Sequence, residues 1–324
     1  MNRAKNHCSD CQPLDRRRFI QSVGAAAVAV PSLFGARAVH GAPSRSSSAE
    51  TAVARFHQSL SDEQRQQICL PFEHESRQRI SANWHVVDPV VGDSFYTDEQ
   101  RRTIDEIVRN VTSEDGYERL LRQMDDDDGG IESYSVAMFG DPEAGQFEWE
   151  MTGRHLTLRA DGNTVDQAAF GGPIVYGHGE EDTQANLFHY QTQKANEVFQ
   201  ALDSGQAEQA LLQQSPEESA VELQGPDGSF SGVSVADLSS DQKQLVEETL
   251  KVLLAPYRQQ DIDEAMQFVN ADGGLDKLNM AFYQDEDLND DRVWDVWRIE
   301  GPSMVWHFRG APHVHAYINI GVRT

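Results

Sequence analysis

The sequence predicts an α+β fold with a largely antiparallel sheet and helices packed around it in blocks. Helix-start motifs and stretches with an alternation of apolar and polar residues come in separate groups along the chain. A strict alternation of helix and strand would instead favour a parallel sheet with crossover helices. The chain is long enough for one large domain with a full core.

A short phrase, in which Ser or Thr is followed three residues later by Gln, predicts three helix starts. It occurs as LSDEQRQQI from Leu60, YTDEQRRTI from Tyr96 and LSSDQKQLV from Leu238. The hydroxyl can cap the helix, acidic or polar residues fill the first turn, and apolar residues follow at helical spacing. The three copies are unevenly spaced, so they indicate helix starts and not a solenoid. Helices are expected over 183–213, 239–256 and 261–269.

Strands are predicted where side chains alternate with a period of two residues. These stretches are 133–140, 146–165, 277–284, 293–301, 303–310 and 313–321. Asp161-Gly162 predicts a turn. The glycine-rich stretch 169–182 is predicted to be a loop. Residues 214–238 predict a long loop that could also form an internal boundary.

Residues 1–38 resemble a twin-arginine export signal. Residues 16–20 (Arg-Arg-Arg-Phe-Ile) precede a weakly apolar run, and Ala36-Arg37-Ala38 has the small-x-small pattern of a cleavage site. The run contains Gly24 and Pro31 and falls short of the ~20 strongly apolar residues of a spanning helix. We therefore expect recognition by the twin-arginine export machinery, a periplasmic or secreted protein, and no stable membrane insertion after processing.

The remaining chain is divided into a tether and a single domain. Residues 39–52 are rich in Ser and predict a disordered tether, and residues 53–324 predict one α+β domain. The chain has 27 Lys and Arg against 53 Asp and Glu, a formal net charge of −26. A field of that sign repels phosphate backbones and anionic lipids and attracts cations. Nucleic acid is therefore not an expected partner.

The last predicted strand contains two histidines that suit a metal ion. His313 and His315 are two residues apart, so on a strand they share a face at roughly 6.5–7 Å. His155, in EWEMTGRHLTLRADG, would supply a third nitrogen and leave an open coordination position. All-nitrogen ligation suits a divalent transition metal such as zinc, copper, iron or nickel. The alternative is that these are solvated or hydrogen-bonded strand histidines.

Two further histidines are reserve ligands. His307 faces the same side as the pair if the intervening hairpin loop has three or five residues, whereas a four-residue loop turns it away. His178 lies in the glycine-rich stretch, where a close approach of backbone to a ligand is possible. An ordinary turn histidine is the alternative for His178.

Other polar side chains are candidates for substrate contacts. Arg154 or Arg159 could orient an anionic substrate, with Tyr176 also in the substrate site. Glu150 or Tyr176 could act as acid or base. The alternative for Arg159 is an ion pair with one of the many acids of the chain.

Two acidic runs do not match a calcium loop. DEDLNDD from Asp285 has Asp where the sixth position needs Gly, and DDDDGG from Asp125 fails in a similar way. Both are predicted to be solvated acidic loops.

The chain resembles an uncharacterised family catalogued as domain of unknown function 3500, whose members are commonly exported bacterial proteins. The resemblance covers roughly residues 55–324 and rests on short motifs: the LS-x-x-Q helix starts, GRHL at 153–156, RIEGPSMVW at 298–306 and the final HVH. The family's Gly-His-His-Leu phrase is Gly-Arg-His-Leu here, so the resemblance carries over His155 alone. A carboxylate that follows the family's Gly-Pro phrase is represented by His307. The resemblance implies no activity.

Together these patterns predict an exported soluble protein with a histidine-rich divalent metal site. The proposed ligands are His155, His313 and His315, with His307 as the next candidate. The function that follows is a metal-dependent enzyme acting on a small anionic substrate. The alternative is a non-catalytic metal- or ligand-binding protein of the cell envelope.

Overall fold

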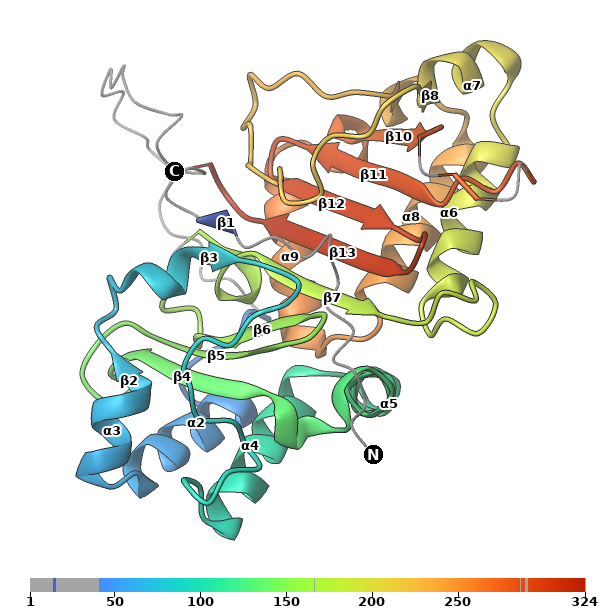
Figure 1. Ribbon diagram of the computed structural model, residues 1–324. Coiled ribbons are helices and arrows are strands. Elements are labelled where there is room, and N and C mark those ends of the chain that lie inside the picture. The colour runs from blue at the N-terminus through green and yellow to red at the C-terminus, as the bar shows by residue number, and fades with distance from the viewer. Residues whose placement is uncertain (1–13, 16–40, 166, 286, 289–290, 324) are drawn as a thin grey trace, which may run out of the picture.

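The computed structural model describes residues 14–15, 41–165, 167–285, 287–288 and 291–323. The predicted export signal lies outside the described residues, apart from the two-residue strand β1 (Leu14–Asp15), which pairs with β3. The described chain forms helices around one eleven-stranded, largely antiparallel sheet, which confirms the predicted α+β class (Figure 1). None of its described helices combines the length and apolar character that a bilayer span requires.

The N-terminal half of the chain supplies one end of the sheet and the helices beside it. Its elements are α2 (Ser48–Ser59), α3 (Asp62–Ile68), β2 (Cys69–Leu70), β3 (Arg79–Ile80), α4 (Asp98–Val111), α5 (Glu114–Asp128), β4 (Ser135–Gly140), β5 (Phe147–Gly153), β6 (Leu156–Ala160) and β7 (Ile174–His178).

The C-terminal half supplies the other end. Its elements are α6 (His189–Gln200), α7 (Ser204–Ala210), β8 (Leu211–Leu212), β9 (Val233–Ser234), α8 (Ser240–Leu254), α9 (Gln259–Ala271), β10 (Asn279–Tyr283), β11 (Val296–Gly301), β12 (Met304–Arg309) and β13 (Val314–Ile320). Short 3-10 turns lie at Glu75–Gln78, Ile131–Ser133, Ala169–Gly171, Val235–Asp237 and Leu275–Lys277.

The two halves repeat one arrangement. The sheet order is β2-β4-β5-β6-β7-β13-β12-β11-β10-β8, with β9 on β10, so it runs outward from a central β7–β13 pair in the same way on both sides. The edge strands β2 and β8 each run parallel to their neighbours β4 and β10, and the other pairs are antiparallel. The helices α5 and α9 precede the antiparallel strands β4–β6 and β10–β12. Each is followed by an Asp-Gly-Gly turn, at 128–130 and 272–274, in which both glycines have a positive φ. One sheet therefore joins two similar units.

The three predicted helix starts are confirmed as capping boxes. In α3, α4 and α8 the hydroxyl of Ser61, Thr97 or Ser239 accepts from the backbone N–H three residues on, and the Gln at that position reaches back to the cap. The capping glutamines also join helices, because Gln64 and Gln100 donate to one another's side-chain oxygen at 2.9 Å. Each of these two capping glutamines thus fixes the start of its own helix and also connects that helix to the next one.

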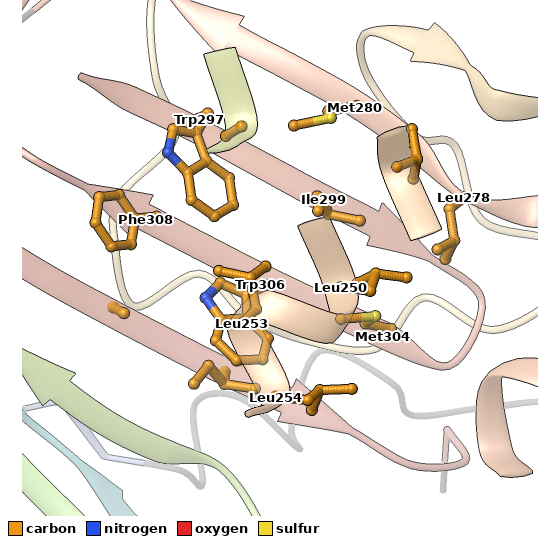
Figure 2. Close-up of a cluster of buried hydrophobic side chains, with 14 of the residues drawn as sticks. Leu250, Leu253, Leu254, Leu278, Met280, Trp297, Ile299, Met304, Trp306 and Phe308 are labelled. Atoms are coloured by element: carbon orange, nitrogen blue, oxygen red, sulfur yellow. The ribbon is translucent and has the colours of Figure 1, made fainter. Parts of the chain in front are cut away.

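The apolar core of the C-terminal half lies on the helix side of the sheet. Trp297 and Phe308, on adjacent strands, stack with ring centroids 4.8 Å apart, and Trp306 faces the leucines of α8, among them Leu253 (Figure 2). Alternate residues of the same strands point to the opposite face. On that second face the strands carry buried Arg, His and Glu side chains.

Three details differ from the sequence-based expectations. Residues 48–52 were expected in a disordered tether but form the start of α2, with Ala49 and Ala52 fully buried. The stretch 169–182 was expected to be a loop but contains β7, which lies in the middle of the sheet. The single stretch 146–165 is divided into β5 and β6 by a turn at 154–155. Periodicity missed β7 because both of its faces are buried.

A buried group of acids joins the two halves on the helix side. Arg258, just before α9, makes two hydrogen bonds to Glu50 of α2, at 2.9 and 2.7 Å, and one to Asp261 at 2.9 Å. Asp161 and Glu264 are also buried and interact with these acids. Burial and the neighbouring acids raise the pKa of Glu264 to about 9, and burial raises the pKa of Asp161 and of Asp261 to about 7. One arginine does not neutralise four carboxylates.

This group predicts that stability falls as the pH rises. The folded chain binds more protons than the unfolded chain between about pH 4 and 9, because the folded pKa values exceed the ordinary ones. We expect the free energy of unfolding to decrease between pH 6 and pH 9 by on the order of 5 kcal/mol. Denaturant titration of Glu264→Gln should show a weaker decrease. The exposed Glu118→Gln is the control, and equal pH profiles for both variants would contradict the assignment.

Candidate metal centre

Three histidines meet on the polar face, above the central strand β7. In the strand register Leu156 pairs with Tyr176 and His315 pairs with Gly177, so His155 and His315 flank Gly177 from either side. A Cβ atom on Gly177 would lie 3.2 Å from the His155 Cβ and 2.2 Å from the Val314 carbonyl oxygen. The absence of a side chain at Gly177 therefore lets the two imidazoles approach across the strand.

His155 occupies a tight turn and not a strand. With Arg154 it forms the two-residue connection between β5 and β6, and its φ is 56°, an uncommon value for a residue other than Gly. The turn is held from outside: the His155 N–H donates to the Ala82 carbonyl at 2.5 Å, and the Arg154 carbonyl accepts from the Tyr134 hydroxyl at 2.8 Å. A strained backbone fixed by its surroundings is typical of functional sites.

The three imidazoles are close enough to share one ion. Their ring centroids lie 5.0 Å apart for His155 and His313, 4.9 Å for His155 and His315, and 4.7 Å for His313 and His315. One ligand atom from each lies within 4.8 Å of the others, and the Nε2 atoms of His313 and His315 are 3.0 Å apart. Two nitrogens on one tetrahedral zinc ion are about 3.3 Å apart. The predicted convergence of these three side chains is therefore present.

Asp127, near the end of α5, orients His155. Its Oδ2 lies 2.7 Å from His155 Nδ1 and accepts from Gln123 Nε2 at 2.8 Å, while its Oδ1 accepts from the Gly179 N–H at 2.8 Å. Burial acts to raise the pKa of Asp127, but the hydrogen bond and charge of His155 and the other donors outweigh it, so the pKa lies below its usual value. The Asp127 carboxylate is therefore ionised and accepts the Nδ1 proton of His155.

Glu218 orients His315 in the same way. Its Oε2 lies 2.8 Å from His315 Nδ1, and its Oε1 forms a 2.6 Å ion pair with Arg309. Arg309 Nη2 is also 3.0 Å from His315 Nδ1. We place a proton on Nδ1 and let it be donated to the closer Glu218 oxygen, because a carboxylate is an acceptor. Burial acts to raise the pKa of Glu218, and the hydrogen bond and charge of His315 together with Arg309 lower it below its usual value. Glu218 is thus also ionised and accepts the Nδ1 proton of His315.

Neither carboxylate was identified from the sequence. Asp127 belongs to the acidic run that was expected to be a solvated loop, but its side chain is only 3% exposed, so that expectation is wrong for this residue. Glu218 comes from the long loop after β8, which shows no pattern that marks it. A carboxylate behind a ligand histidine is defined by tertiary contact and has no fixed spacing in sequence.

His307 lies on the same face but outside the group of three. Five residues separate the paired residues Arg309 and His315, and in this register His307 pairs with Tyr317. Its Nδ1 accepts from Arg298 Nε at 3.3 Å. Burial, with the charge of Arg298 second, lowers the pKa of His307 to about 3. His307 is therefore a neutral partner of Arg298.

His178 and Tyr176 alternate with Gly177 and point to the helix side. His178 Nδ1 accepts from the Leu187 N–H at 3.2 Å, and its Nε2 is 3.4 Å from Asp126 Oδ2. The Tyr176 hydroxyl donates to Gln191 at 2.5 Å. The structure thus places both candidates on the side of β7 away from the three imidazoles.

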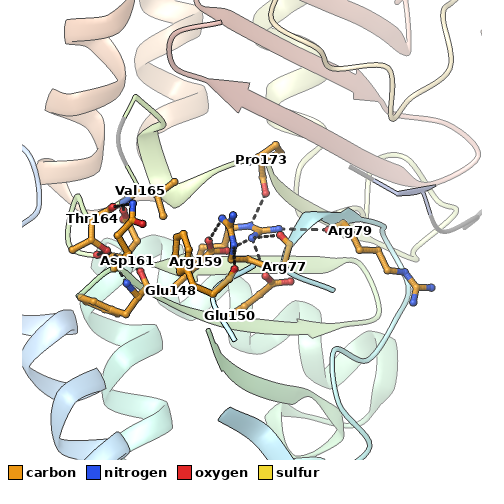
Figure 3. Close-up of polar contacts among 12 residues, drawn as sticks. Arg77, Arg79, Glu148, Glu150, Arg159, Asp161, Thr164, Val165 and Pro173 are labelled. Carbon is orange, nitrogen blue, oxygen red and sulfur yellow. Dashed lines mark hydrogen bonds and ion pairs between the residues drawn. The ribbon is translucent and has the colours of Figure 1, made fainter. Parts of the chain in front are cut away.

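Arg159 and Glu150 pair with one another on the polar face. Arg159 Nη1 is 2.8 Å from Glu150 and is also ion-paired with Glu148, while its Nε donates to the Pro173 carbonyl at 2.8 Å (Figure 3). Arg77 makes a further 3.1 Å ion pair to Glu148. This is the ion-pair alternative for Arg159, and it leaves the buried charges compensated.

Arg154 borders the histidine group. A Cβ atom on Gly179 would lie 3.1 Å from Arg154 Nη2 and 3.3 Å from His155 Cε1, so the guanidinium and the imidazole lie against the same short stretch of backbone. Arg154 is half-buried, whereas His155 and His315 are fully buried. Among the candidate substrate contacts, Arg154 is thus the one beside the histidines.

Comparison with known proteins places the chain in one family and gives no further likeness. No curated protein and no solved structure matches the sequence significantly. The family described as protein of unknown function (DUF3500) matches residues 43–318, which is most of the chain and agrees with the likeness expected from the short motifs. The chain therefore belongs to the DUF3500 family.

Proposed function

We propose that the protein binds one divalent transition-metal ion through His155, His313 and His315. The observation that carries this proposal is the pair of carboxylates behind the imidazoles, Asp127 with a side chain 3% exposed and Glu218 with one 20% exposed. Asp127 and Glu218 each lie at hydrogen-bond distance from an Nδ1 atom, which leaves Nε2 of a neutral His155 or His315 to face an ion between them. A carboxylate behind a ligand histidine is the usual second layer of a protein metal site.

The donor set limits the ion. Three imidazole nitrogens suit zinc, copper or iron better than calcium or magnesium, which prefer oxygen ligands. The site lies on a sheet whose opposite face has its own large apolar core. Loss of the ion is therefore not expected to unfold the protein, in contrast to a small zinc-dependent domain.

The proposed role of the ion is to bind a small anionic ligand or substrate at a remaining coordination position. Three protein ligands leave such a position open, as in catalytic zinc sites. Arg154 beside His155 is the group proposed to attract the anion. The second candidate function is non-catalytic metal binding, which the burial of the site favours: His155 and His315 are 0% exposed and His313 is 8% exposed.

We further propose that the protein is exported by the twin-arginine route to the periplasm or beyond. The support is the Arg-Arg-Arg-Phe-Ile sequence of residues 16–20 followed by the weakly apolar run and the small-x-small pattern. That route accepts proteins that are already folded, and would allow a metal to be inserted before export.

The first prediction of this proposed function concerns metal retention. His155→Ala, His313→Ala and His315→Ala should each reduce bound metal strongly, because each removes one of three protein ligands. Metal content is measured by mass spectrometry, together with the visible absorption of cobalt-loaded protein. Far-UV circular dichroism should stay unchanged in all three variants.

The control for this experiment is His57→Ala. His57 lies on α2 and contacts Arg65, away from the polar face. Near-stoichiometric metal in all five proteins, wild type included, would refute the site. Azide added to the cobalt-loaded wild type tests the remaining coordination position: a changed spectrum supports an open site, and an unchanged spectrum supports non-catalytic binding.

The second prediction concerns the two carboxylates. Asp127→Asn and Glu218→Gln should each weaken metal affinity by about 10- to 100-fold, since an amide holds the Nδ1 proton less strongly than a carboxylate does. The measurement is competition against a chromogenic chelator. Asp126→Asn is the matched control, because it removes the same charge from the adjacent residue, which faces His178. Equal affinities for the Asp127 and Asp126 variants would show that only net charge matters.

The third prediction concerns export. Replacement of Arg16, Arg17 and Arg18 by Lys should leave the precursor in the cytoplasm, because an ammonium group does not reproduce the planar guanidinium. Cell fractionation followed by immunoblotting gives the distribution. Processed protein outside the cytoplasm in this variant would contradict the twin-arginine assignment.

A further inference from the structure

A second group of buried polar side chains lies on the same face as the histidines, on strands β10 to β12. Arg298 of β11 pairs directly with His307 of β12, and the ring of Tyr283 on β10 has its centroid 6.5 Å from that of His307. Arg298 is 5% exposed, His307 1% and Tyr283 2%. A guanidinium at this depth requires compensation by nearby acceptors.

The contacts of Arg298 do not supply that compensation. Its Nε donates to His307 Nδ1 at 3.3 Å, a long bond to a neutral acceptor. The nearest carboxylate oxygen in an ion pair, Glu300 Oε2, stands 3.8 Å from Nη1, which is beyond hydrogen-bonding distance. Within the described part of the chain Nη2 has no hydrogen-bond partner. A guanidinium has five N–H donors, so this group has more donors than acceptors.

Two neighbours of Arg298, His307 and Tyr283, carry no negative charge. The carboxylates of Glu300 and Glu222 act on Arg298 through their charge, but within the described residues neither forms a hydrogen bond with it. His307 accepts at Nδ1, so its single proton lies on Nε2, and its lowered pKa keeps the ring neutral. Burial raises the pKa of Tyr283 to about 12, so its hydroxyl stays protonated. Burial lowers the pKa of Arg298 itself, which agrees with a cation that has lost water and gained little in return.

We propose that Arg298, with His307 beside it, forms a binding site for the carboxylate group of a small organic acid. The planar fork of a guanidinium matches a carboxylate through two parallel hydrogen bonds. Such a ligand would supply an acceptor for Arg298 Nη2, which has none among the described residues. The segment after β8 covers the site: Gln224 donates to Glu300 at 2.9 Å, and the Val221 carbonyl accepts from Asn319 at 2.9 Å. Arg298 is only 5% exposed, so we expect only a small ligand to reach it.

This site is separate from the three-histidine group and does not depend on it. His307 and His315 lie on adjacent strands two residues out of register, which corresponds to about 8 Å between their Cα atoms. Arg309 and Glu218 occupy the space beside His315 as an ion pair, so Arg309 is already neutralised. Arg298, in contrast, has its ion-pair oxygen, Glu300 Oε2, at 3.8 Å.

The experiment uses metal-free protein, so that an anion bound to a metal does not contribute. Acetate, succinate, inorganic phosphate and the neutral acetamide are each titrated by calorimetry, and the thermal midpoint is recorded in parallel. We expect saturable binding of a carboxylate and none of acetamide. Arg298→Gln should weaken carboxylate binding by on the order of 10- to 100-fold, and Arg298→Lys should restore only part of it, because Lys lacks the fork.

Glu300→Gln gives the opposite and more specific result. It removes the carboxylate that competes for Arg298 while an amide oxygen can still accept from Gln224, so it should tighten carboxylate binding. Arg102→Gln, at an exposed position, is the charge control and should bind as the wild type does. Phosphate binding that exceeds carboxylate binding would replace the proposed ligand class. Absence of saturable anion binding in the wild type, or equal binding in the wild type and Arg298→Gln, would overturn the proposal.

Discussion

The pairing of β7 with β13 is the contact on which the rest of the structure depends. It joins two similar units edge to edge into one sheet, and it is antiparallel, with Gly177 opposite His315. This register places the β5–β6 turn of one unit beside the start of the last strand of the other. A shift by one residue would move the His315 side chain to the helix side and separate it from His155. The shared site therefore requires this one register.

The two faces of the sheet follow different physical rules. On the helix side, Trp297, Trp306 and Phe308 are buried among apolar neighbours, and the hydrophobic effect accounts for their position. On the other face burial of charge would be unfavourable unless each charge is paired. Most are paired: Arg159 with Glu148 and Glu150, and Arg309 with Glu218. The incompletely paired Arg298 and the three converging imidazoles are thus exceptions that point to ligands.

The sequence carried the local features of the fold better than the contacts between distant segments. The capping boxes at Ser61, Thr97 and Ser239 and the strands near the C-terminus follow from short-range physics, and they are present as predicted. The pairing of His313 and His315 on one face is also a local feature, since side chains two residues apart in an extended segment point to the same side. Strand β7 was missed because its residues are buried on both faces and lack alternation. From the sequence alone, such a strand cannot be distinguished from a glycine-rich loop.

The partners of the histidines show where sequence reasoning ends. Asp127 is one of four consecutive aspartates, and the helix α5 alone decides which of them faces His155. Glu218 lies in a segment whose path depends on contacts such as that between Val221 and Asn319. Gly177 is required for a space that exists only after β6, β7 and β13 are assembled. These three residues are defined by the tertiary structure, so a single sequence could not reveal them.

The comparison of the two units shows why the described residues form a histidine group beside one hairpin turn and not beside its counterpart. The turn between β5 and β6 is Arg154-His155, and the corresponding two-residue turn between β11 and β12 is Pro302-Ser303. Ser303 occupies the position that corresponds to His155. Its hydroxyl donates to the Phe268 carbonyl at 3.1 Å, which connects the turn to α9. The second unit instead contributes His313, just before β13, and His315, on β13, beside the first unit's turn. The histidine group thus lies at the junction of the two units. One unit contributes His155 from its hairpin turn, and the other contributes His313 and His315 from the start of the last strand.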